Sequence, residues 1–117
     1  MNTVPEIANR LSSLCSEHKF VEAYTELFLE HAESIDPIYK NVPLKGLVNL
    51  IEREKQFLSA NVIHELKLSE PIFAGSYFSI IISMSFTPNG GERKNMEELC
   101  VYKVENGKII SQQFFIG

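Results

Sequence analysis

The chain has few cysteines, no long apolar run and no basic cluster, and each scarcity excludes a class of protein. Cys15 and Cys100 lie far apart and form no CxxC motif, so we expect buried thiols and neither a disulfide framework nor a zinc site. The longest apolar runs, such as residues 80–82, are far too short to cross a bilayer. Lys and Arg number 11 against 15 Asp and Glu, for a net charge of -4. Nucleic acid and anionic membranes are therefore poor partners, and we expect a cytoplasmic protein.

The composition is that of an ordinary globular protein. The chain has 117 residues, of which 44% are hydrophobic and 22% are charged, so we expect a single domain over residues 1–117. A chain of this length buries roughly two thirds of the surface that its unfolded form exposes. It can therefore form a core without disulfides or a metal ion.

Two amphipathic helices are predicted in the first third of the chain. Thr3 and Glu6 match a capping box with Pro5 in the first turn, and apolar residues at helical spacing continue as far as about Cys15. A second helix is predicted to end near residues 30–33. Its apolar stripe consists of Phe20, Tyr24, Leu27, Phe28 and His31.

A turn and a third helix follow. Asp36 precedes Pro37, which disfavours helical geometry and indicates a turn or an extended segment. The third helix is predicted to end near Asn61, with the charged residues 52–55 on its solvated side. Its apolar stripe consists of Leu44, Leu47, Val48, Ile51 and Leu58.

After Asn61 the apolar pattern alternates with a period of two, which is typical of strands. Val62, His64 and Leu66 fall on one face of the first strand, and we expect that face to point inward. Further strands are predicted over residues 77–87, 96–104 and 108–116, with a two-residue hairpin turn at Asn106 and Gly107. Three helices followed by long antiparallel strands predict an α+β fold, in which the helices cover one face of a curved, cone-shaped sheet with a hollow.

Three stretches carry a resemblance to a known superfamily. They are residues 20–28 (FVEAYTELF), residues 34–37 (SIDP) and residues 98–110 (ELCVYKVENGKII). In order and spacing they resemble the nuclear transport factor 2-like superfamily, which includes the SnoaL-like polyketide cyclases and the ketosteroid isomerases, over nearly the whole chain. The resemblance implies a cystatin-like cone, a hydrophobic pocket for a small molecule, and pairing of two subunits through the open side of the sheet.

The same resemblance assigns the candidate catalytic residues. The catalytic base of the ketosteroid isomerases occupies the aspartate of an Asp-Pro motif, which is Asp36 here. Their second functional acid falls on Glu98, with a gap of one residue. The position of their partner tyrosine is Ser12 in this chain. The residues alone leave alternatives open. Asp36 is either a pocket residue or a turn former, and Glu98 is either a functional acid, the partner of a nearby donor or a solvated residue.

Two histidines are further candidates. His31 ends the predicted second apolar stripe, five residues before Asp36, and either takes part in the chemistry of the pocket or caps the helix, where the helix dipole favours an imidazolium. His64 falls on the face of its strand that we expect to point inward. It is either a ligand-binding residue or a histidine satisfied within the core.

The remaining candidates form the wall of the expected pocket, although each is equally a plain core residue. They are Tyr24, Phe28, Phe57, Ile82, Met84, Phe86, Cys100, Tyr102, Gln112 and Phe114. The carboxylates and histidines have no spacing typical of metal ligands, so we expect neither a metal nor a cofactor.

These features favour a protein that binds an apolar or aromatic small molecule. Two carboxyl groups in an apolar pocket can divide the work of a base and a hydrogen-bond donor, as described for ketosteroid isomerase. The predicted function is an isomerase or cyclase that abstracts a proton next to a carbonyl. The alternative is a non-catalytic module of the same fold that binds a ligand or forms a homodimer, for which the opposite sheet face around Leu99 and Val101 is suited.

Overall fold

The computed structural model describes residues 2–117 and contains three α-helices, a short 3-10 helix and seven strands. The helices are α1 (Val4–Ser16), α2 (Phe20–Leu27) and α3 (Leu47–Ala60), and the 3-10 helix is η1 (Pro37–Tyr39). The strands are β1 (Phe28–Ile35), β2 (Leu44–Lys45), β3 (Asn61–Leu68), β4 (Ile72–Ala74), β5 (Tyr77–Pro88), β6 (Lys94–Glu105) and β7 (Lys108–Ile116). None of the helices in this part of the chain is both long and apolar enough to cross a membrane.

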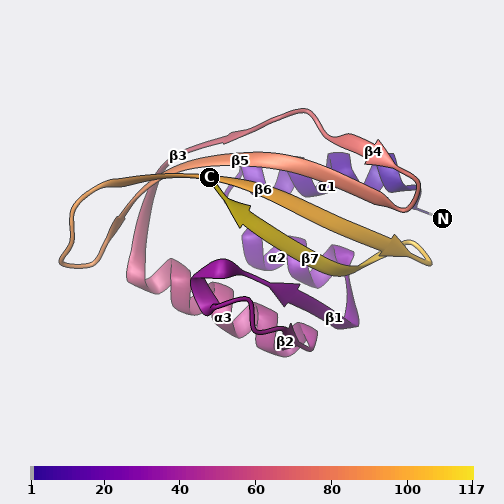
Figure 1. Ribbon diagram of the computed structural model, residues 1–117, viewed down its shortest axis with the longest axis horizontal. Coiled ribbons are helices and arrows are strands. Elements are labelled where there is room, and N and C mark those ends of the chain that lie inside the picture. The colour runs from indigo at the N-terminus through magenta and orange to yellow at the C-terminus, as the bar shows by residue number, and fades with distance from the viewer. Residues whose placement is uncertain (1) are drawn as a thin grey trace.

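All seven strands belong to one curved, open sheet. Its order is β2-β1-β7-β6-β5-β3, and β4 pairs with β5 at one side. The predicted α+β class is confirmed, but the sheet is mixed rather than wholly antiparallel, because β1 pairs with β7 in parallel. Figure 1 shows the long strands β5, β6 and β7 lying over α1 and α2, with α3 beside β1 and β2. The helices and the inner face of the sheet therefore enclose the core.

Local sequence signals set several element boundaries as predicted. The capping box of α1 is present: the Thr3 backbone N–H donates to Glu6 Oε1 at 2.9 Å, and the Glu6 N–H donates to Thr3 Oγ1 at 3.3 Å. Asn106 and Gly107 have φ angles of 51° and 76°, as a type I′ hairpin turn requires. Because such turns match the twist of the strands that they join, this one sets the pairing of Glu105 with Lys108 and of Val104 with Ile109. A bulge after Lys103 then shifts the register of the rest of β6 and β7.

The second predicted helix is too long. The structure ends α2 at Leu27, and β1 begins at Phe28, so His31 lies on a strand. Residues 28–35 fit both the helical and the strand period. Phe28 and Ala32 are buried four residues apart, as in a helix, whereas Ala32 and Ser34 alternate as in a strand, and a bulge lies between Phe28 and Glu33. Pairing with β7, more than 70 residues away in sequence, decides in favour of the strand.

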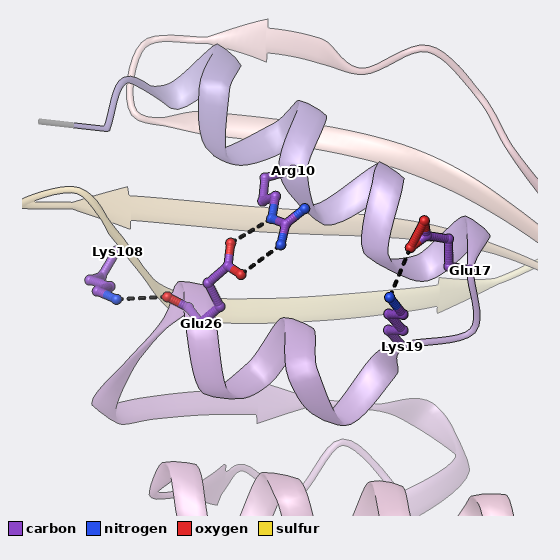
Figure 2. Close-up of polar contacts among 5 residues, drawn as sticks. All are labelled: Arg10, Glu17, Lys19, Glu26 and Lys108. Atoms are coloured by element: carbon purple, nitrogen blue, oxygen red, sulfur yellow. Dashed lines mark hydrogen bonds and ion pairs between the residues drawn. The ribbon is translucent and has the colours of Figure 1, made fainter.

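Hydrogen bonds to exposed side chains connect the two N-terminal helices to β7 (Figure 2). Arg10 on α1 donates to both carboxylate oxygens of Glu26 on α2, at 2.6 and 2.9 Å. Lys108 Nζ donates to the Glu26 carbonyl oxygen at 2.7 Å. Exposed ion pairs contribute little free energy, but this bidentate pair orients α2, the helix that carries Tyr24.

Candidate functional site

A cavity of about 350 Å³ lies between the inner face of the sheet and the helices. Eleven of the candidate residues predicted from the sequence line it: Tyr24, Phe28, Asp36, Phe57, Ile82, Met84, Phe86, Glu98, Tyr102, Gln112 and Phe114. The lining is mostly aromatic and aliphatic, with a small number of polar groups, as in typical small-molecule sites. Several of these lining residues could be predicted from strand alternation, because β5 and β6 present every second residue to the cavity.

Asp36 lies at the end of β1, where the chain turns into η1. Its Oδ1 accepts a hydrogen bond from the backbone N–H of Ile38 at 2.9 Å, so the side chain caps η1, with Pro37 in the first turn. The residue is only 7% exposed and lines the cavity. Asp36 is therefore both a turn former and a residue of the cavity lining.

Glu98 lies on β6, opposite Ile82 on β5 and Ile116 on β7. The residue is 8% exposed, and its carboxyl forms no hydrogen bond or ion pair with any other residue in 2–117. Burial raises the pKa of Glu98 to about 7, and the charges of Asp36 and Glu54 act in the same direction. At neutral pH a large fraction of this carboxyl is therefore protonated.

A third carboxyl, which the sequence analysis missed, enters the cavity from α3. Glu54 lines the cavity together with Leu50, Arg53 and Phe57, and these four residues have the i, i+3, i+4, i+7 spacing of one helical face. Burial raises the pKa of Glu54 to about 7, the Arg53 charge opposes the shift, and the Asp36 charge adds to it. Arg53 and Glu54 were expected on the solvated side of the helix, and that expectation is wrong.

A hydrogen-bond network lies beside the cavity and includes three of its lining residues, Tyr24, Arg53 and Gln112. Gln112 Nε2 donates to Tyr24 Oη at 2.7 Å and to Ser34 Oγ at 3.0 Å. Arg53 Nη2 donates to the same Ser34 Oγ at 2.8 Å, and its guanidinium stacks 4.4 Å above the Tyr39 ring. Ser34 and Gln112 are almost fully buried, so this network holds polar side chains rigidly beside the cavity.

Comparison with known proteins gives the family. Residues 2–116 match the family model of the SnoaL-like domain. The chain belongs to the SnoaL-like domain family. No curated protein sequence matches it significantly.

Solved structures have the same fold as this SnoaL-like domain. A protein from Mesorhizobium loti described as a SnoaL-like polyketide cyclase has a TM-score of 0.88 and 24% sequence identity, over 97% of this chain and 98% of that chain. A nuclear transport factor 2-like protein of unknown function from Burkholderia pseudomallei has a TM-score of 0.77 and 14% identity, over 98% and 92%. TerC, crystallised with polyporic acid, has a TM-score of 0.80 and 11% identity, over 98% and 92%.

The structure places three candidate residues of the SnoaL-like domain outside the cavity lining. His31 is exposed on β1 and borders a shallow surface groove with Glu33 and Lys103. His64 is exposed because β3 has a bulge between Ile63 and residue 65, which reverses the inward face of the strand. Its Nε2 lies 2.7 Å from Thr87 Oγ1. Cys100 is fully buried behind the lining, and burial raises the pKa of its thiol.

Ser12 also lies away from the cavity of the SnoaL-like domain. The residues of α1 that line the cavity are Leu11 and Cys15, and burial raises the pKa of the Cys15 thiol to about 12. The Ser12 hydroxyl is buried without a hydrogen-bond partner among the described residues.

Within residues 2–117, no three His, Cys, Asp or Glu side chains converge in a way that would hold a metal ion. The fold and the cavity make this SnoaL-like domain a ligand-binding pocket protein.

Proposed function

We propose that this SnoaL-like domain, acting as a single unit over residues 1–117, binds an apolar or aromatic carbonyl compound and catalyses its isomerisation or intramolecular cyclisation. The reaction begins with abstraction of a proton from the carbon next to the carbonyl. The observation that carries the proposal is the presence of Asp36 and Glu98, two carboxyls in different environments, in one mostly apolar cavity. Proton-transfer sites typically hold two titratable groups in environments that make one an acid and the other a base.

Asp36 is the proposed base. Its Oδ1 is engaged by the Ile38 N–H, which leaves Oδ2 to accept the proton from carbon. The parallel pairing of Ile35 with Gln113 brings Asp36 beside Phe114, whose partner on β6 is Cys100. Glu98 precedes Cys100 by two residues on β6. At the usual rise of a strand, it lies roughly 7 Å from the row formed by Asp36, Phe114 and Cys100. A flat ligand between the two rows has one carboxyl near its reacting carbon and the other near its carbonyl oxygen.

Glu98 is the proposed hydrogen-bond donor. In its protonated form it donates to the carbonyl oxygen and stabilises the enolate as negative charge develops there. In an isomerisation, the protonated Asp36 returns the proton to another carbon. In a cyclisation, the enolate carbon bonds to a second carbonyl carbon, the C=O π bond of that carbonyl breaks, and its oxygen takes the proton from Asp36 to become a hydroxyl. The scheme requires no metal and no cofactor.

Deuterium uptake from D2O tests the proposal without knowledge of the natural substrate. We expect the protein to accelerate exchange of the carbon-bound protons next to the carbonyl of 2-tetralone and related aromatic ketones, measured by proton NMR. Glu98→Gln should slow the exchange, because an amide is a weaker donor to an enolate. Glu97→Gln is the matched control, since Glu97 is the exposed neighbour on the outer face of the same strand. Exchange no faster than in buffer for every ketone would overturn the proposed activity.

The alternative function is ligand binding without catalysis. It is favoured by the capping bond from Ile38 to Asp36, which gives Asp36 a structural role, and by the location of Ser12 outside the cavity. A binding module would keep its ligand affinity within a few fold in the double variant Asp36→Asn, Glu98→Gln, and the wild type would show no turnover. An enzyme would keep the affinity and lose turnover in that variant.

We also propose that the protein forms a homodimer through the outer face of the sheet. Ile81, Leu99 and Phe115 are direct cross-strand partners on β5, β6 and β7. All three side chains are more than 40% exposed and form an apolar row across the outer face. A row of this kind, flanked by serines and other polar residues, suits an isologous contact between two copies.

Leu99→Glu should convert the dimer to a monomer. In an isologous contact the substitution places two buried carboxylates near each other, while an isolated subunit presents this face to water and tolerates the charge. The mass is measured by size-exclusion chromatography with light scattering, and circular dichroism checks the fold. Val48→Glu is the matched control, because Val48 is 79% exposed on α3, away from the sheet face. A monomeric wild type would contradict this proposal and leave the pocket chemistry unaffected.

A further inference from the structure

The Tyr24 hydroxyl has a donor but no acceptor among its neighbours. The Gln112 amide has two hydrogens on Nε2, and these go to Tyr24 Oη and to Ser34 Oγ. Tyr24 Oη therefore accepts, and its own proton has no acceptor in residues 2–117. Burial raises the pKa of Tyr24 far above its usual value, so the phenol keeps this proton at any physiological pH. Since Tyr24 lines the cavity, the free proton is available to a ligand.

The support around Tyr24 fixes the direction of this hydroxyl. Gln112 is 3% exposed, and its position is set by Ser34, which also receives a hydrogen bond from Arg53. The Tyr24 ring packs against Phe28 with a centroid distance of 4.7 Å, and Phe28 in turn packs against Tyr102 at 6.4 Å. A hydroxyl held in this way loses little conformational entropy when it binds a ligand.

Tyr24 and Glu98 serve different ends of the cavity. Gln112 pairs with Tyr102 on β6 and with Ser34 on β1, so the Tyr24 hydroxyl belongs to this row of the sheet. Glu98 lies four residues before Tyr102 on the same strand, roughly 13 Å away along the backbone. Asp36 lies beside the row between them, next to Phe114. The lining therefore offers a hydrogen-bond donor at each end and the carboxylate of Asp36 between them.

We propose that the ligand carries two oxygen functions at opposite ends of an apolar body, and that Tyr24 donates a hydrogen bond to the oxygen remote from the reacting carbonyl. This inference rests on the proposed function, because Glu98 is taken to bind the reacting carbonyl. Tyr24 is a specificity-determining residue under this proposal, since it selects ligands with an acceptor at the far end. The ligand class is thus a keto compound with a second carbonyl, ether or hydroxyl oxygen.

Three bicyclic ketones that differ only at the far end test the inference. They are 2-tetralone, 6-ethyl-2-tetralone and 6-methoxy-2-tetralone, the last of which replaces a methylene by an ether oxygen. Dissociation constants are measured by NMR titration of the full chain. We expect the wild type to bind the methoxy compound about fivefold more tightly than the ethyl compound. Tyr24→Phe should abolish this preference.

The ratio of the two affinities separates ligand recognition from a structural role of Tyr24. A general loosening of the pocket in Tyr24→Phe weakens both compounds together and leaves their ratio unchanged. Tyr77→Phe is the matched control, because Tyr77 is exposed on β5 and does not line the cavity, and it should keep the wild-type ratio. The folded state of each variant is checked by circular dichroism.

The outcomes distinguish this inference from the proposed reaction. Equal affinities for the methoxy and ethyl compounds in the wild type would overturn the inference. A preference that disappears in Tyr24→Phe supports the inference even if no ketone exchanges deuterium, in which case only the catalytic proposal fails. If none of the three compounds binds, both the ligand class and this inference are overturned.

Discussion

Asp36→Asn is expected to slow the exchange of carbon-bound protons by about 10²- to 10⁴-fold, the usual contribution of a positioned general base. Asparagine has nearly the same shape, and its carbonyl oxygen can accept the hydrogen bond from the Ile38 N–H, so the turn into η1 is kept. The amide cannot take a proton from carbon. Deuterium uptake by 2-tetralone measures the rate, and NMR titration should show a dissociation constant within a few fold of the wild-type value.

The matched control for this prediction is Glu30→Gln. Glu30 is a carboxylate on the same strand, β1, but it is exposed and does not line the cavity, so exchange should be unchanged. If Asp36→Asn exchanges protons at nearly the wild-type rate, Asp36 is not the base. Glu54 is then the remaining carboxyl to test, because it lines the same cavity.

Glu98→Gln is expected to stabilise the protein more at pH 8 than at pH 5. The pKa of Glu98 is raised from 4.5 to about 7, so between these values the folded state binds more protons than the unfolded state. The free energy of unfolding therefore falls as the pH rises through this window, and the loss is complete above pH 7. Glutamine carries no such penalty. Urea unfolding should show a gain of roughly 2 to 3 kcal/mol at pH 8 and little change at pH 5.

Glu97→Gln controls for the loss of a negative charge from β6. Glu97 is exposed on the outer face of the strand, so its substitution should have the same small effect at both pH values. A gain in Glu98→Gln that is equal at pH 5 and pH 8 would show that the carboxyl is solvated, and would remove the support for Glu98 as a protonated donor. The comparison also tests burial directly, because desolvation is the largest cause of the shift.

The parts of the site that could be predicted are those set by local periodicity. On β5 and β6 every second side chain points inward over an unbroken stretch, so Ile82, Met84, Glu98 and Tyr102 could be placed on the correct face from alternation alone. Gln112 and Phe114 followed in the same way from the alternation of β7. The Asn106-Gly107 turn predicted the hairpin, but it sets the pairing only next to the turn, because a bulge after Lys103 shifts the register of the rest of β6 and β7.

The parts that could not be predicted depend on partners distant in sequence. His31 was expected on a helix because residues 20–31 keep helical spacing, but β7 recruits residues 28–35 into the sheet. The alternation through His64 was correct as a strand pattern, but a bulge in the pairing with β5 reverses its faces, and single sequences carry no clear signal for a bulge. In both cases tertiary pairing decided which face of the strand is buried.

Glu54 was missed for a different reason. In the segment from Glu52 to Lys55 every residue is charged, and charged residues are usually solvated on a helix. The available signal was the apolar pair Leu50 and Phe57, which lie seven residues apart and define a face that includes Glu54. A half-buried acid on such a face breaks the amphipathic pattern, as polar residues of functional sites often do.

The parallel pairing of β1 with β7 also determines when the site can form. Asp36 is positioned by β1, and the long strand that pairs with β1 is β7, the last strand of the chain. Loop closure over such a long separation is slow and entropically costly. During synthesis, the hairpin of β5 and β6 has both of its strands before β7 emerges. Asp36, Gln112 and Phe114 come together only after residues 108–116 have left the ribosome. The proposed base and the β7 wall of the pocket are thus assembled last.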